Sequence, residues 1–345
     1  MKRRVTLKDV AKAAGVHVST ASRALDPNNR HLITSEAAER ILAISQEIGY
    51  RHNAAAASLR TARTRTVGVV VPDITNPIFS PIVRGVEDVL MPRSLVAIVG
   101  NTDGDARRKE MLIAMLQERG VDGFILACAE LQNPAVERLA AEGRAVVTLN
   151  RHLGDDAVSS VVHDEDEGIR RVLTHLVSLG HEHIASIGAP QHFSSGVARY
   201  LAFERHRDAM PLAADNDLIV FANQDNEVEG ERCVEELLAR GQRFTAIVCA
   251  SDRLAIGAIG ALTRRGIACP DDISVTGYND LPMMDLLNPP LTTVRVSQYQ
   301  MGCEAAEILA GMIETGVSAP SHVVLPVDLV IRGSTKAVAK VGVDA

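Results

Sequence analysis

Residues 5–25 read VTLKDVAKAAGVHVSTASRAL, and this stretch decides the fold of the N-terminal part of the chain. Apolar residues recur at helical spacing within residues 6–13, which predicts an amphipathic helix. Thr6, followed by an acidic residue three positions later, is typical of a capping box. Gly15 can adopt the positive φ of a sharp turn, and a second short helix is predicted over residues 18–25.

Further outward, a third helix is predicted over residues 35–48, with Thr34 as its N-cap and Gly49 as its stop. Two short helices joined by a glycine-containing turn and followed by a third form the core of a helix-turn-helix unit. In such a unit the N-terminal side chains of the second helix face base edges in the major groove. The sequence therefore predicts an all-α DNA-binding head, with a plain helical bundle as the alternative.

The candidate DNA-reading side chains lie at the start of the second helix. Arginine can donate two hydrogen bonds to guanine, serine can reach a base or a phosphate, and valine can contact a thymine methyl group. The predicted contacts are His17, Val18, Ser19, Ser22 and Arg23.

The charge distribution supports this prediction. Residues 1–65 contain 12 Lys and Arg residues against 5 acidic residues, although the whole chain has a net charge of −7. A basic head on an acidic body is polarised, and only the head suits the phosphate backbone of DNA.

From Thr66 onward, β-branched runs alternate with helical segments, which is typical of parallel sheets in doubly wound α/β units. The expected strands are TVGVVVP, LVAIVG, DGFILAC, AVVTLN, HIASIG, LIVFA, TAIVCA and ISVTGY. About 280 residues exceed one such sheet, so we expect two similar lobes.

Ligands bind to doubly wound sheets at the carboxyl ends of the strands. The polar residues that follow the expected strands are Asn76, Asn101, Asp103, Asn150, Arg151, Asp252, Asn279 and Asp280. Each of them could instead be a helix cap or a turn residue. Planar polar groups in a cleft suit a polyhydroxylated ligand, because they can bond adjacent hydroxyl groups.

The sequence resembles the lactose/galactose-repressor family over essentially its whole length. The resemblance begins in residues 5–25 and continues through GYRHNAAAASLR (49–60) and VGVVVPDITNPIF (67–79). Later matches are NTDGD (101–105), VDG (121–123), LGH (179–181), SDRLAIG (251–257), ISVTGYND (273–280), PPLTTV (289–294) and LVIRGST (329–335). Two departures are His17, where a capping serine is usual, and Asn279, where an aspartate is frequent.

The resemblance implies four segments. These are a DNA-binding domain at 1–50, a hinge helix and linker at 51–65, a two-lobed effector-binding and dimerisation domain at 66–335, and a tail at 336–345. The body would have the type I periplasmic-binding-protein-like fold. The hinge would push Leu59 into the minor groove, where an apolar wedge can kink DNA. The hinge departs from the family at His52 and Ala57.

Further site residues follow from the resemblance. Thr6, Asn53 and Ala56 join the implied DNA contacts. The implied effector contacts are Phe79, Arg199, Ser251, Asn279 and Gln298. Because the chain has no Trp, we expect a residue such as Phe79 or Phe221 to supply any stacking surface. Together with Asn76, Asp103 and Arg151 they make up the predicted effector site.

The predicted function is a DNA-binding transcription regulator, in particular a repressor, controlled by a sugar or sugar derivative. A purine-like corepressor is the alternative effector. We expect a homodimer on palindromic operator DNA, because paired heads match two half-sites. Whether the effector releases or strengthens DNA binding does not follow from the sequence.

Other classes of protein fit less well. Met1-Lys2-Arg3-Arg4 is not followed by an apolar stretch, so neither secretion nor a sugar-transport role is expected. The five cysteines are scattered, as expected for reduced thiols in a cytoplasmic protein, and the apolar runs are too short to span a membrane. The chain has no P-loop, GxSxG or HExxH motif, and HEH at 181–183 is a weak metal pattern, so we expect no enzyme, cofactor or metal.

Overall fold

The computed structural model describes residues 5–26, 29–50, 63–131, 133–151, 153, 157–213, 215–316 and 319–338. The chain divides into two compact units, residues 1–64 and residues 65–345, called here the head and the body. Each unit is described by itself.

The head contains the three predicted helices. They are α1 (Leu7–Ala14), α2 (Val18–Leu25) and α3 (Ser35–Glu47), with a short 3₁₀ turn η1 (Arg30–Leu32) before α3. Val10, Ala21 and Ile41 are fully buried between the helices. The small alanine side chains let these short helices pack closely.

The predicted start and end signals of α1 are confirmed. The backbone N–H of Thr6 donates to Asp9 Oδ2 at 2.9 Å, and Asp9 N–H donates back to Thr6 Oγ1, which completes the capping box. Gly15 ends the helix with a φ of 66°, in the left-handed region that glycine adopts easily.

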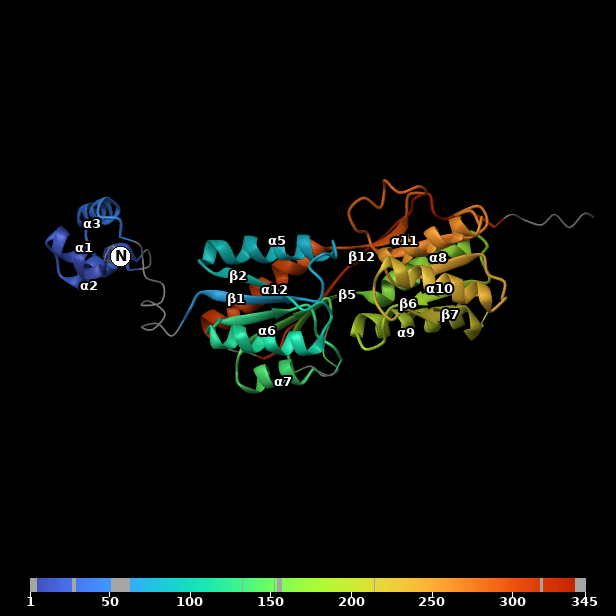
Figure 1. Ribbon diagram of the computed structural model, residues 1–345, viewed down its shortest axis with the longest axis horizontal. Coiled ribbons are helices and arrows are strands. Elements are labelled where there is room, and N and C mark those ends of the chain that lie inside the picture. Colours follow the sequence, from blue (N-terminus) through green and yellow to red (C-terminus); the bar gives the residue numbers. More distant parts are fainter. Residues whose placement is uncertain are drawn as a thin grey trace, which may run out of the picture. The chain divides into compact units, whose positions relative to one another are not determined.

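The body consists of two α/β lobes (Figure 1). Lobe 1 contains β1 (Thr66–Val71), α5 (Phe79–Leu90), η2 (Met91–Arg93), β2 (Val96–Asn101), α6 (Ala106–Glu118), β3 (Gly123–Leu126), α7 (Pro134–Ala141), β4 (Ala145–Leu149), β5 (Ser159–His163), α12 (Gln298–Thr315) and β11 (His322–Leu325). Lobe 2 contains α8 (Glu165–Ser178), β6 (Ile184–Gly188), α9 (Ser194–Ala209), η3 (Asn216–Leu218), β7 (Ile219–Phe221), α10 (Glu227–Ala239), β8 (Ala246–Cys249), α11 (Asp252–Arg264), β9 (Ser274–Asn279), β10 (Thr292–Val296) and β12 (Val327–Val330).

The two sheets repeat one topology. Their strand orders are β11-β5-β4-β3-β1-β2 in lobe 1 and β12-β10-β9-β8-β6-β7 in lobe 2. All neighbours are parallel except β10 and β12, which pair antiparallel. In lobe 1, α5 and α12 pack together, and in lobe 2, α10 packs on α11 and α8 on α9 (Figure 1). The predicted two-lobed, doubly wound fold is confirmed.

The chain crosses between the lobes at three described places. These are β5 to α8, β10 to α12, and β11 to β12. Asp164 N–H donates to the carbonyl oxygen of Leu325 at 3.0 Å, which joins the first crossing to the third. β5, β10, β11 and β12 were not among the strands expected from the sequence.

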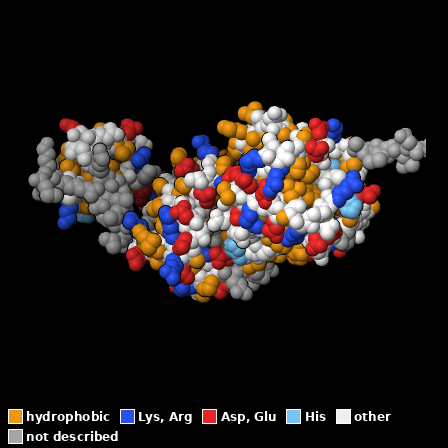
Figure 2. Space-filling view, turned by 45° about the vertical axis from the view of Figure 1, so that its right-hand side comes forward, with side chains coloured by type: hydrophobic (Ala, Val, Ile, Leu, Met, Phe, Trp, Pro, Cys, Tyr) orange, Lys and Arg blue, Asp and Glu red, His pale blue; other side chains and the backbone are white. Residues whose placement is uncertain are grey.

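The sheets differ at their outer edges. In lobe 1 the edge strand β2 exposes Val96, Ile98 and Val99, and Val96 is 62% exposed. In lobe 2 the edge strand β7 has only three residues, of which Ile219 and Val220 are buried. Apolar side chains also reach the surface among charged ones elsewhere on the body (Figure 2).

The start of the predicted tail is part of lobe 2. Lys336 N–H donates to Ser274 Oγ at 3.0 Å, and Val338 N–H donates to the carbonyl oxygen of Leu179. His181, from the weak metal pattern, instead bonds Thr245 and the carbonyl oxygen of Lys336. Within the described residues, no helix combines the length and the apolar character needed to cross a membrane.

Candidate DNA-binding helix and effector cleft

The recognition helix α2 begins with an unusual cap. The Nδ1 atom of His17 accepts the backbone N–H of Ser19 at 3.3 Å and lies 2.8 Å from Ser19 Oγ. A histidine nitrogen thus caps the N-terminus of α2, a role that serine, threonine or aspartate usually has. Because a backbone N–H can only donate, Nδ1 must be the acceptor in this bond.

The other predicted DNA contacts of the head lie in the described residues. Thr6, His17, Ser19 and Arg23 are exposed, and Val18 and Ser22 are half-buried. The buried side of α2 is formed by Ala21 and Ala24. The predicted hinge contacts Asn53, Ala56 and Leu59 lie outside the described residues.

A cleft of about 530 Å³ lies between the two lobes of the body. Its walls come from segments that follow strands β1, β2 and β4 of lobe 1 and β6, β7, β8 and β9 of lobe 2. The lining residues are Pro72, Asp73, Asn76, Ile78, Phe79, Asp103, Gly104, Asn150, Arg151, Ala189, Pro190, His192, Phe193, Ser195, Arg199, Asn223, Gln224, Asp225, Asn226, Ala250, Ser251, Arg253 and Asn279. This is the ligand position expected for doubly wound sheets.

Seven of the nine predicted effector residues line this cleft. They are Asn76, Phe79, Asp103, Arg151, Arg199, Ser251 and Asn279. Gln298 does not line the cleft, but its side-chain amide donates to the carbonyl oxygen of Asn279 at 2.9 Å. Phe221 does not line the cleft, because its ring packs edge-on against Tyr200 at 5.0 Å. The sequence showed that Phe221 ends a strand but not where its ring points.

Arg199 is held by a buried ion pair. Its Nε donates to Glu165 Oε2 at 2.6 Å and its Nη2 to Glu165 Oε1 at 3.1 Å, while the guanidinium lies 3.7 Å from the centroid of the Tyr278 ring. Arg199 and Glu165 are 7% and 8% exposed. Burial opposes the charge, but Glu165 outweighs it and raises the pKa of Arg199 above its ordinary value.

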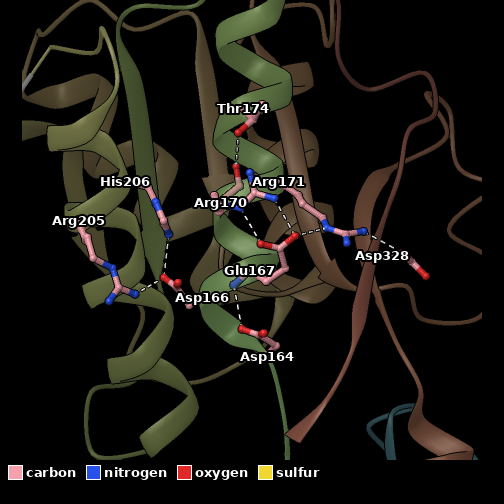
Figure 3. Close-up of polar contacts among 9 residues, drawn as sticks. All are labelled: Asp164, Asp166, Glu167, Arg170, Arg171, Thr174, Arg205, His206 and Asp328. Atoms are coloured by element: carbon pink, nitrogen blue, oxygen red, sulfur yellow. Dashed lines mark hydrogen bonds and ion pairs between the residues drawn. The ribbon is translucent and has the colours of Figure 1, made fainter.

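An exposed polar cluster holds the helix that carries Glu165 (Figure 3). Asp164 caps α8 by accepting the N–H of Glu167 at 3.0 Å. Glu167 bonds Arg170 and Arg171, and Arg171 reaches Asp328 on β12 at 2.8 Å. The first turn of α8 is thereby fixed at the lobe crossing. A further contact of this cluster, from His206 to Asp166 at 2.8 Å, joins α8 to α9, the helix of Arg199.

Arg151 differs from Arg199 in having no carboxylate partner among the described residues. Its guanidinium lies 3.3 Å from the centroid of the Phe193 ring, which belongs to the other lobe. Its Nε and Nη1 atoms are buried, and neither makes a hydrogen bond to the described residues. Burial lowers the pKa of Arg151 to about 10, so the group remains a cation near neutral pH.

Sequence reasoning missed several residues of the cleft. Arg253 on α11 bonds Glu227 twice at 2.8 Å and lies 3.5 Å from Asp73 of lobe 1, which bridges the lobes. Asp225 follows β7 and accepts the hydroxyl proton of Ser251. The rule of polar residues after strands could have found both aspartates. Phe193 comes from the loop before α9, and nothing in the sequence pointed to it.

Next to the cleft, lobe 2 buries a carboxyl group at the start of α11. Asp252 accepts the hydroxyl of Thr293 at 2.5 Å and the N–H of Leu281 at 2.7 Å. The side chain is fully enclosed, and burial raises the pKa of Asp252 to about 7 despite these bonds. Although Asp252 was a candidate as a residue after a strand, it does not line the cleft.

The chain combines a helix-turn-helix head with a two-lobed α/β body that contains an interlobe cleft. This combination defines a class of protein, the DNA-binding transcription regulators that carry a ligand-binding domain. Residues 6–53 match the model of the bacterial regulatory proteins of the lacI family. Residues 173–335 match that of a periplasmic binding protein-like domain.

The transcriptional regulator RegA of Clostridium saccharobutylicum is 31% identical to this chain over 331 residues, which cover 96% of this chain and 99% of that protein. A LacI family regulator from Enterococcus faecium, solved with bound ribose, is 32% identical, covers 79% of this chain and 99% of its own, and has a TM-score of 0.70. The regulator CelR in complex with cellobiose is 28% identical over 96% of this chain and 100% of its own, with a TM-score of 0.74. The chain belongs to the LacI family of DNA-binding transcription regulators.

Proposed function

We propose that this regulator is a repressor whose DNA binding is controlled by a small polyhydroxylated effector, a sugar or sugar derivative, held in the interlobe cleft. The cleft is the observation that carries the proposal. It brings together carboxylate, amide and guanidinium groups beside the rings of Phe79 and Phe193. Such a mixture can bond adjacent hydroxyl groups and cover the apolar face of a sugar ring. The cellobiose and ribose complexes among the similar structures support the same class of ligand.

The effector acts by preferring one arrangement of the lobes. Only a difference in affinity between two arrangements can transmit a signal to DNA. The contacts that cross the cleft, from Arg253 to Asp73 and from Arg151 to Phe193, would change when the lobes move. In this proposal the cleft binds its ligand without transforming it, and the protein acts in the cytoplasm.

Binding to DNA requires a homodimer in this proposal, because paired heads match the two halves of a palindrome. The exposed edge of lobe 1 supports an interface there. β2 presents Val96, Ile98 and Val99 together with an unpaired backbone edge, and such edges are normally covered.

At the DNA, α2 would occupy the major groove with Arg23 and Ser19 facing the bases. His17 would hold the first turn of α2, and Thr6, Val18 and Ser22 would flank the contact. Asn53, Ala56 and Leu59 would meet the minor groove, and Leu59→Ala should then weaken operator binding without weakening effector binding.

Fluorescence anisotropy with DNA from upstream of the protein's own gene tests the regulator. The full chain should bind this DNA in low salt, where phosphate contacts are strongest. Arg23→Ala should cost about 1–3 kcal/mol on specific DNA and much less on random DNA. Arg40→Ala removes an equal charge from α3 and serves as the matched control. An equal loss on both kinds of DNA would assign Arg23 to a phosphate instead.

The effector is tested by thermal denaturation of the full chain with sugars, sugar derivatives and purines. A ligand of the native state raises the melting temperature. The anisotropy assay repeated with the bound compound then distinguishes an inducer, which releases DNA, from a corepressor. A shift with purines alone would replace the sugar by the alternative effector.

A further inference from the structure

The cleft contains two buried polar groups that have no hydrogen-bond partner among the described residues. On the lobe 1 wall, Nε and Nη1 of Arg151 are hydrogen-bond donors without an acceptor among the described residues. On the lobe 2 wall, Oδ1 of Asn279 is an acceptor without a donor. Buried polar atoms are almost always hydrogen-bonded, so an unpaired donor and an unpaired acceptor in one cleft point to a ligand.

The charge of Arg151 sets it apart from the other arginines of the cleft. Arg199 is neutralised by Glu165, and Arg253 is paired with Glu227. Among the described residues, Arg151 lies over the face of the Phe193 ring, which attracts a cation but accepts no N–H in the plane of the guanidinium. A buried cation without a counter-charge is unfavourable unless something else supplies the charge.

The described acids near Arg151 hydrogen-bond other groups, although the charges of Asp225 and Glu130 still act on it from a distance. Glu130 bonds the buried Lys109 at 3.0 Å, and Asp225 accepts the hydroxyl proton of Ser251. Asp103, also on the lobe 1 wall, pairs with Arg108 and accepts the amide of Asn101 at 2.6 Å. None of them forms an ion pair with Arg151.

We propose that the effector is a hydroxylated acid, with a carboxylate or phosphate group that binds Arg151 and hydroxyl groups that donate to Asn279 and its neighbours. This inference rests on the proposed function, since it specifies the ligand of the same cleft. The acid group supplies the missing counter-charge on lobe 1, and a hydroxyl satisfies the amide oxygen on lobe 2. One molecule of this kind would join the two walls.

The position of Asn279 agrees with this ligand. The side chain of Asn279 is a neutral amide, so no negative charge at this place repels an acid. Its backbone has a φ of 113°, and the amide of Gln298 holds its carbonyl oxygen, so the side chain is directed by a fixed main chain.

Isothermal titration calorimetry of the full chain tests the proposal with matched pairs of probes at constant ionic strength. The carboxylate pairs are D-gluconate with D-glucitol, and D-galacturonate with D-galactose. The phosphate pair is glucose 6-phosphate with glucose. We expect at least one acid to bind tenfold or more tightly than its neutral counterpart. Comparison of the carboxylate pairs with the phosphate pair also shows whether the acid group of the effector is a carboxylate or a phosphate.

The variant Arg151→Gln should abolish this preference by lowering the affinity for the acid at least tenfold relative to the affinity for its neutral counterpart. Arg84→Gln is the matched control, because Arg84 is exposed on α5 and pairs with Asp88 outside the cleft. Thermal melts of both variants without ligand check that they fold.

The outcomes separate the two proposals. If neutral sugars bind as well as their acids, or if Arg151→Gln keeps the preference, the acid inference is wrong while the cleft remains an effector site. If neither acids nor neutral sugars bind, the carbohydrate effector fails and the acid inference fails with it. DNA binding through α2 is measured separately and is affected by neither result.

Discussion

Arg151 in lobe 1 and Arg199 in lobe 2 both place a guanidinium in the interlobe cleft, but their surroundings differ. Arg199 is paired with Glu165 from the preceding helix α8 and lies over Tyr278, whereas Arg151 lies over Phe193 with two N–H groups that no described residue accepts. The sheets behind them have the same strand order. The difference therefore comes from the loops and helix ends, and it separates an arginine that maintains the fold from one that is available to a ligand.

The largest expected effect is on the free energy of unfolding, which should fall much more when Arg199 is replaced than when Arg151 is replaced. Arg199→Ala leaves Glu165 buried without its partner, and we expect a loss of about 3–5 kcal/mol in the free energy of unfolding. Arg151→Ala leaves behind no buried carboxylate that paired with it among the described residues, so its change should stay within about 1 kcal/mol. Urea unfolding of the full chain, followed by circular dichroism, measures both.

A double variant guards against the case in which Arg199→Ala does not fold. Arg199→Met combined with Glu165→Gln removes both charges, and it should regain much of the stability lost with Arg199→Ala. Equal losses for Arg151→Ala and Arg199→Ala would contradict the distinction between the two sites.

The second prediction uses Asp252, the buried carboxyl group of lobe 2. Its pKa is raised by burial from the ordinary value of 3.8 to about 7. The stabilisation by its protonated form is complete below about pH 4 and is lost as the pH rises through 7. The shift corresponds to up to roughly 4 kcal/mol. Asp252→Asn should therefore remove a fall in stability between pH 5 and pH 8, as measured by thermal melts at several pH values.

The third prediction concerns His163, the last residue of β5, at the first lobe crossing. Its effect on the pH dependence of stability should be opposite to that of Asp252. Burial lowers the pKa of His163 to about 4, near Glu165 and Arg199. The neutral imidazole stabilises the fold above pH 6.5, and this contribution is lost as the pH falls through 4, a total of roughly 3 kcal/mol. His163→Gln should make the protein less sensitive to acid, while Asp252→Asn should not. If the stability of the two variants changed with pH in the same way, the prediction that Asp252 and His163 have opposite pH dependences would be wrong.

Much of this difference between the lobes was not accessible from the sequence. The sequence predicted the three head helices, the two lobes and eight strands, because helical spacing and runs such as Val67–Val71 are local signals. β5, β10, β11 and β12 were missed. They lie next to lobe crossings and carry polar residues such as Ser159 and Thr292. Their pairing depends on chain segments that are distant in sequence.

The cleft was predicted well where strand ends point into it and less well elsewhere. Asn76, Asp103 and Arg151 came from the rule of polar residues after strands. Which arginine is paired could not be predicted, because Glu165 and Arg199 are 34 residues apart and meet only through the packing of α8 on α9. Similarly, a capping role for His17 was visible only in the distance between its Nδ1 and the N–H of Ser19.

The fourth prediction compares the sheet edges of the lobes. If β2 is the dimer interface, Ile98→Lys should weaken the dimer by a hundredfold or more, about 2.7 kcal/mol, because it places a charge in an apolar contact. Phe221→Lys at the end of the short edge strand of lobe 2 is the control and should leave the dimer intact. Sedimentation velocity over a range of concentrations measures both. A monomeric wild-type protein, or an intact Ile98→Lys dimer, would exclude β2 as the interface.

The smallest expected effect lies on α8, where two glutamates two residues apart have the same kind of partner. Glu165 pairs with Arg199 inside the protein, and Glu167 pairs with Arg170 and Arg171 at the surface (Figure 3). The two surface arginines lower the pKa of Glu167 to about 2, but exposed pairs add little to stability because water screens them. Glu167→Gln should therefore destabilise the protein several-fold less than Arg199→Ala in the same urea assay. Its effect should also shrink in high salt, whereas that of Arg199→Ala should persist. If Glu167→Gln were as harmful, the number of ion pairs on α8, and not their burial, would decide how firmly this wall of the cleft is held.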